Sequence, residues 1–80
     1  MNSEYEILKD LIGMIRDDLN YDEDGMLVDD EFDSFEILQI IMLINEKFDV
    51  EIPPSEIKPE VFKGLGSIYE MIERVKKTNR

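Results

Sequence analysis

The 80-residue sequence contains no cysteine, no histidine and no tryptophan. Without cysteine the chain can form neither a disulfide framework nor a thiolate of its own. Without histidine it lacks the usual ligand of zinc and haem and the usual proton shuttle of active sites. No apolar run approaches the roughly 18 residues that span a bilayer, and the acidic, polar start is unlike a secretory leader. We therefore expect one small cytoplasmic domain that covers residues 1–80.

Negative charge is concentrated in the middle of the chain. Eleven acidic residues and no Lys or Arg lie between Asp17 and Glu46, whereas nine acids and nine bases cancel elsewhere. This central segment therefore accounts for the whole formal net charge of −11. Such a field should repel nucleic acid and anionic membranes and attract basic protein surfaces. A purely solubilising surface is the alternative interpretation of a charged run.

Apolar residues recur at helical spacing in three segments. They predict a first helix over about residues 4–18, a second from Asp33 or Ser34 to about Phe48, and a third that is capped by Ser67. The second helix is apolar over most of its circumference, which indicates packing on several sides or a partner-binding face. Its predicted core positions are Leu38, Ile41, Ile44 and Phe48.

The segment before the last helix is rich in proline. Pro53, Pro54 and Pro59 exclude a long helix there and leave short turns near residues 55–57 and 60–62. The predicted fold class is therefore all-α, a small bundle of three main helices plus one short helix. A long first loop precedes the second helix, and long loops in compact domains often have a function.

The first loop contains a pattern that is similar to a calcium-binding loop. The stretch "NYDEDGMLVDDE", residues 20–31, places oxygen ligands at Asn20, Asp22 and Asp24, a glycine at Gly25 and a glutamate at Glu31. The first ligand is Asn rather than Asp, and no second loop of this kind is present to pair with it. We assign no metal site, and keep a calcium-binding module that uses Asn20 to Glu31 as the alternative function.

The stretch "DSFEILQIIMLINEKFDVEIP" resembles the acyl carrier protein family. In that family a D-S-L or D-S-F motif starts the second helix, and an ending such as E-x-F-x-V-x-I-P follows. Asp33, Ser34 and Phe35 match the motif, and residues 46–53 match the ending. Length, acidity and the long first loop agree as well. The glutamine at position 39 is more typical of D-alanyl carriers and dedicated stand-alone carriers than of fatty-acid carriers, which often have Glu or Asp there. The identity of the cargo therefore stays open.

The resemblance implies a carrier and not an enzyme. Ser34 would bear a covalent 4′-phosphopantetheine arm, whose thiol holds an acyl or aminoacyl cargo as a thioester, as in fatty acid biosynthesis. Asp33 and Phe35 would lie beside the arm. The partners would be a phosphopantetheinyl transferase and the enzymes that activate and transfer the cargo, and we expect a monomer. The predicted partner-binding residues are Glu36, Gln39, Met42 and Glu46. The alternative role for Ser34 or Asp33 is that of a helix N-cap.

Overall fold

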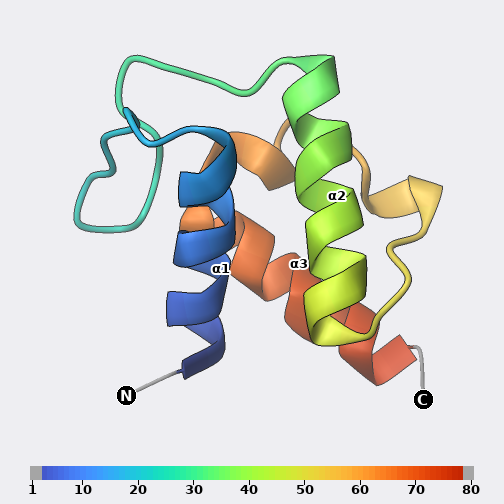
Figure 1. Ribbon diagram of the computed structural model, residues 1–80. Coiled ribbons are helices and arrows are strands. Elements are labelled where there is room, and N and C mark those ends of the chain that lie inside the picture. The colour runs from blue at the N-terminus through green and yellow to red at the C-terminus, as the bar shows by residue number, and fades with distance from the viewer. Residues whose placement is uncertain (1–2, 79–80) are drawn as a thin grey trace.

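The computed structural model describes residues 3–78, and it contains three α-helices and two short 3₁₀-helices in that range. The helices are α1 (Ser3–Ile15), α2 (Ser34–Phe48), η1 (Pro54–Glu56), η2 (Val61–Lys63) and α3 (Leu65–Thr78). Figure 1 shows α1 and α2 side by side and antiparallel, with α3 crossing behind them. The all-α bundle predicted from the sequence is confirmed. The one short helix of the prediction is two 3₁₀ turns, because the prolines interrupt the segment. No helix among these residues is long and apolar enough to cross a membrane.

The hydrophobic core lies where the inner faces of the three helices meet. α1 packs against both α2 and α3. Leu8, Leu11 and Ile12 recur at helical spacing on α1, so they share the face that is turned away from solvent. The side chains with less than 2 % exposure are Leu8, Ile12, Ile40, Ile44, Leu65, Ile68, Met71, Ile72 and Val75.

The first helix is shorter than the sequence predicts. It ends at Ile15 instead of residue 18, although Arg16 N still donates to Ile12 O at 2.9 Å. Asp17 and Asp18 follow directly. Negative side chains interact unfavourably with the partial negative charge at a helix C-terminus. These two acids are a physical reason for the early end.

The last helix begins earlier than predicted. It starts at Leu65, so Ser67 lies inside its first turn and is not its cap. The Ser67 hydroxyl donates instead to Val61 O at 2.6 Å and to Gly64 O at 3.1 Å. The serine therefore joins η2 to the start of α3.

The first loop is fixed to the start of α3 by backbone contacts. Leu65 N donates to Gly25 O at 2.6 Å, and Leu27 N donates to Lys63 O at 2.9 Å. Gly25 is buried and has a left-handed φ of 79°, which glycine adopts without a steric penalty. At Gly64 a Cβ would lie 2.3 Å from Gly25 O and 2.5 Å from the Met26 Cα. The loop and the helix junction approach this closely only because Gly64 has no side chain.

Substitution of Gly64 tests this contact. We expect Gly64→Ala to lower the free energy of unfolding by about 1–3 kcal/mol or more. The atoms that the new Cβ would meet belong to the backbone of Gly25 and Met26, which cannot easily move aside. Urea unfolding followed by circular dichroism measures the change. Gly13→Ala is the matched control. Gly13 lies in α1 with nothing within 4 Å of an added Cβ, so this change should stabilise the protein by about 0.5–1 kcal/mol. A neutral Gly64→Ala would contradict the proposed close contact.

Candidate functional site

The N-terminus of α2 is fixed by a reciprocal pair of hydrogen bonds between Asp33 and Glu36. Glu36 N donates to Asp33 Oδ1 at 2.8 Å, and Asp33 N donates to Glu36 Oε1 at 3.0 Å. This arrangement is a capping box, which satisfies two backbone donors that a helix start leaves unpaired. Of the two caps that the sequence left open, the structure selects Asp33.

Ser34 is the first residue of α2, and it is exposed. Because Asp33 supplies the cap, the Ser34 hydroxyl has no capping role to perform. The residue stands at a helix N-terminus, where unpaired N–H groups and the helix dipole favour a phosphate group, although Asp33 and Glu36 add negative charge beside it. Its position therefore suits a modification that adds a phosphodiester, and it leaves the hydroxyl accessible to a second protein.

A groove of about 580 Å³ opens beside Ser34. Two of its walls come from the first loop and the start of α2, and a third comes from the segment around η2. Its apolar lining consists of Met26, Leu27, Phe32, Ile37, Pro59 and Phe62. Its charged lining is mainly acidic, because Asp30, Glu31 and Asp33 face it together with Lys63. A flexible arm on Ser34 would have an apolar surface within immediate reach. Sequence reasoning did not identify this groove, because its walls are distant in the chain.

The outer face of α2 carries three exposed apolar side chains. Phe35 is 67 % exposed, Leu38 56 % and Met42 69 %. Their spacing of three and four residues places them on one side of the helix. The prediction that Leu38 belongs to the core is wrong, and Ile40, at 1 % exposure, takes the buried position instead. Ile41 and Ile44 are buried as predicted, and Phe48 is partly buried against the core.

The predicted partner-binding residues differ in exposure. Met42 and Glu46 are exposed on α2, whereas Gln39 is half-buried. Glu36 is only 16 % exposed at its side chain, and its carboxylate also accepts a hydrogen bond from Arg16 Nη1 at 3.2 Å. Glu36 is thus held within the chain, in a role that the sequence did not indicate, and its contact with a partner stays a prediction.

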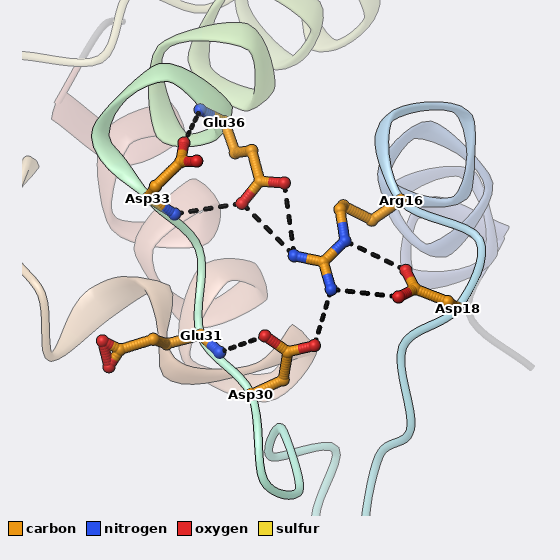
Figure 2. A network of polar contacts seen from close by, with 6 residues as sticks. All are labelled: Arg16, Asp18, Asp30, Glu31, Asp33 and Glu36. Carbon is orange, nitrogen blue, oxygen red and sulfur yellow. Dashed lines mark hydrogen bonds and ion pairs between the residues drawn. The ribbon is translucent and has the colours of Figure 1, made fainter.

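Arg16 connects three separate acidic residues. Its guanidinium pairs with Asp18 at 2.9 Å, Asp30 at 2.6 Å and Glu36 at 3.2 Å (Figure 2). Hydrogen bonds to Asp18 and Asp30 raise the pKa of Arg16 further above its ordinary value. The hydrogen bond from Arg16 lowers the pKa of Asp18 below its ordinary value. The pair therefore stabilises the folded chain at pH values above the ordinary aspartate pKa. This stabilisation is lost as the pH falls through the lowered pKa. The one sequence signal for this role was the position of Arg16 directly before the acidic segment.

The calcium-loop alternative has no assembled ligand set in the structure. Asp22 Oδ1 accepts hydrogen bonds from the backbone N–H groups of Asp24 and Met26, both at 2.9 Å. The Glu31 side chain points away from the neighbouring acidic cluster (Figure 2). Across residues 3–78 no three acidic side chains gather in a way that could hold a metal ion. The carboxylate of Asp22 shapes the turn instead.

Comparison with known proteins decides the family. Over residues 5–75 the sequence matches the family described as a phosphopantetheine attachment site. The chain belongs to this family of carrier proteins. Like other carriers of the family, it holds its cargo on a covalently attached 4′-phosphopantetheine arm, whose thiol supplies the thioester chemistry that a chain without cysteine cannot.

Individual relatives agree with this assignment. The acyl carrier protein of Sulfurovum sp. (strain NBC37-1) is 28 % identical over 75 residues, which cover 86 % of this chain and 97 % of the relative. That of Helicobacter acinonychis (strain Sheeba) is 29 % identical over 73 residues, which cover 84 % and 91 %. Among solved structures, a chain in the crystal structure of Bradyrhizobium japonicum glycine:[carrier protein] ligase complexed with glycylated carrier protein is 25 % identical. It superposes with a TM-score of 0.71 over 88 % of this carrier and 99 % of that chain.

The stability of two variants tests which residue caps α2 in this carrier. We expect Asp33→Ala to lower the free energy of unfolding by about 0.5–2 kcal/mol, because Glu36 N loses its acceptor. Ser34→Ala should have a much smaller effect, since the serine hydroxyl is not the cap. Urea unfolding of both variants gives the comparison, and Asp33→Asn should restore most of the loss. A larger effect for Ser34→Ala would reverse the assignment.

Proposed function

We propose that Ser34 is the attachment site of the phosphopantetheine arm. The observation that carries the proposal is the exposed serine at the first position of α2, whose hydroxyl the Asp33 cap leaves without a capping role. A transferase would catalyse attack of the Ser34 oxygen on the phosphorus of coenzyme A that bears the pantetheine. The new Ser34 O–P bond completes a phosphodiester, the pyrophosphate bond of coenzyme A breaks, adenosine 3′,5′-bisphosphate leaves, and the hydroxyl proton is released. Asp33 and Phe35 flank the arm, and the groove beside Ser34 receives its apolar portion.

We also propose the partners and the setting of this carrier. It has no catalytic activity of its own and depends on a phosphopantetheinyl transferase and on enzymes that activate and transfer its cargo. Relatives are named as acyl carriers, and the similar solved structure contains a glycylated carrier. These names support an acyl or aminoacyl cargo. Residues 1–80 would form one domain, which is supported by the core cluster that the described helices share. This domain would act as a monomer in the cytoplasm, where coenzyme A is available.

Loading of serine variants tests the attachment site. The wild-type apo-protein, incubated with coenzyme A and a broad-specificity phosphopantetheinyl transferase, should gain one phosphopantetheinyl group by intact mass. Ser34→Ala should remain folded by circular dichroism and gain none, because it lacks the hydroxyl that forms the phosphodiester. Ser55→Ala is the matched control, since Ser55 is also exposed but lies in η1, and it should load normally. Modification of the Ser34→Ala variant at another residue would refute the assignment.

We propose that the exposed apolar face of α2 docks the partner enzymes, with Gln39, Glu36 and Glu46 at or near its border. Apolar side chains at the centre of an interface contribute most of the binding energy, and charged rim residues chiefly set the association rate. The negative field of the central segment would attract a basic partner surface to this face. Phe35, closest in sequence to Ser34, would meet the partner first.

Truncation of one side chain on this face tests the docking surface. We expect Met42→Ser to lower kcat/KM of the transferase by about three- to tenfold, since the loss of a buried contact costs on the order of 1 kcal/mol. Its melting temperature should change little, because Met42 is 69 % exposed. Met14→Ser is the matched control, as Met14 is 71 % exposed on α1. Equal losses in both variants would show that no docking face is localised on α2.

A further inference from the structure

The Arg16 guanidinium joins three parts of the chain that meet at the capping box of α2. Asp18 belongs to the segment that leaves α1, Asp30 to the end of the first loop, and Glu36 to the first turn of α2. The Arg16 backbone is itself anchored to α1 by the bond from its N to Ile12 O. Figure 2 shows the guanidinium between the three carboxylates, with Nε and both Nη atoms engaged.

The contact with Glu36 connects Arg16 to the capping box. Glu36 Oε1 accepts from Asp33 N at 3.0 Å and from Arg16 Nη1 at 3.4 Å, and Oε2 accepts from the same Nη1 at 3.2 Å. Arg16 therefore restrains the carboxylate that caps the residue directly before Ser34. Through Asp30, which also accepts from Glu31 N at 2.8 Å, it restrains the chain that enters the motif.

We propose that Arg16 is a positioning residue for the loading of Ser34. It holds the first loop and the capping box in the geometry in which the transferase meets the hydroxyl. A planar fork of donors can bind several carboxylates in fixed directions, whereas a lysine ammonium is a compact point charge. This inference rests on Ser34 as the attachment site, and it assigns a function to a residue outside the attachment motif.

Electrostatics alone predicts the opposite effect on loading. Arg16 is the positive charge beside a segment with eleven acids and no base. Its removal would make the protein more negative and strengthen the attraction of a basic transferase, so that loading would become faster. Positioning predicts slower loading, because the helix start and the loop before it would sample more conformations. The direction of the rate change therefore distinguishes the two roles.

The experiment measures kcat/KM of the transferase with apo-protein variants at constant ionic strength. We expect Arg16→Gln to lower it by about three- to tenfold. Arg16→Lys should restore less than half of the loss, because it keeps the charge without the fork. Arg74→Gln is the matched control. Arg74 binds Glu56 through two hydrogen bonds of 2.8 and 3.3 Å, away from the motif, and its loss should leave loading unchanged.

Two further measurements separate positioning from general stability. In a Glu36→Gln background, Arg16→Gln should cause little additional loss, since Arg16 acts through that carboxylate. Amide hydrogen exchange at Asp33, whose N–H donates to Glu36, should accelerate in Arg16→Gln and not in Arg74→Gln. This second readout needs no loading reaction. It also reports on the restraint when the melting temperatures of the variants differ.

The outcomes distinguish this inference from the assignment of Ser34. Loading at Ser34 with an unchanged or faster rate in Arg16→Gln overturns the positioning role alone. Full rescue by Arg16→Lys likewise overturns it in favour of simple charge. Loading that maps to a residue other than Ser34 overturns the attachment site and the positioning role together. Slower loading at Ser34, with faster exchange at Asp33, supports both.

Discussion

The reciprocal hydrogen bonds between Asp33 and Glu36 determine where α2 begins. A helix start leaves backbone N–H groups unpaired, and the two carboxylates of the capping box satisfy two of them. Because the cap is Asp33, Ser34 becomes the first helical residue, and it is exposed. Had Ser34 been the cap, its oxygen would have been occupied by a backbone N–H. The proposed attachment of the arm at Ser34 thus depends on Asp33 acting as the cap.

The acidic residues of the first loop repel one another, and the fold must hold them close together so that the capping box can form. The loop achieves it mainly through backbone contacts, since Gly25 and Leu27 exchange hydrogen bonds with the segment from Lys63 to Leu65. Arg16 supplies the complementary charge where the loop meets α2. Single ion pairs at an exposed surface contribute little to stability, but the guanidinium of Arg16 pairs with three carboxylates from separate segments. These contacts hold the acidic loop in place despite the repulsion between its carboxylates.

α2 uses its apolar residues on two sides. Ile40 and Ile44 enter the core, whereas Phe35, Leu38 and Met42 face outward. Exposed apolar side chains that gather on one side of a helix are a common feature of interaction sites, and this observation supports the proposed docking surface. That face begins next to Ser34 in the sequence. Under the proposed attachment at Ser34, an enzyme that docks on this face would also contact the arm.

The sequence by itself determined the helical class, the acidic centre and the serine motif. These features are local, because periodicity, composition and a motif with its flanking pattern can be read along one segment. It could not decide whether Leu38 or Ile40 is buried, since α2 is apolar on nearly every side and the positions of α1 and α3 make that choice. It likewise missed the groove beside Ser34 and the contacts of Arg16, which join segments far apart in the chain. Such contacts arise only when the tertiary fold brings those segments together.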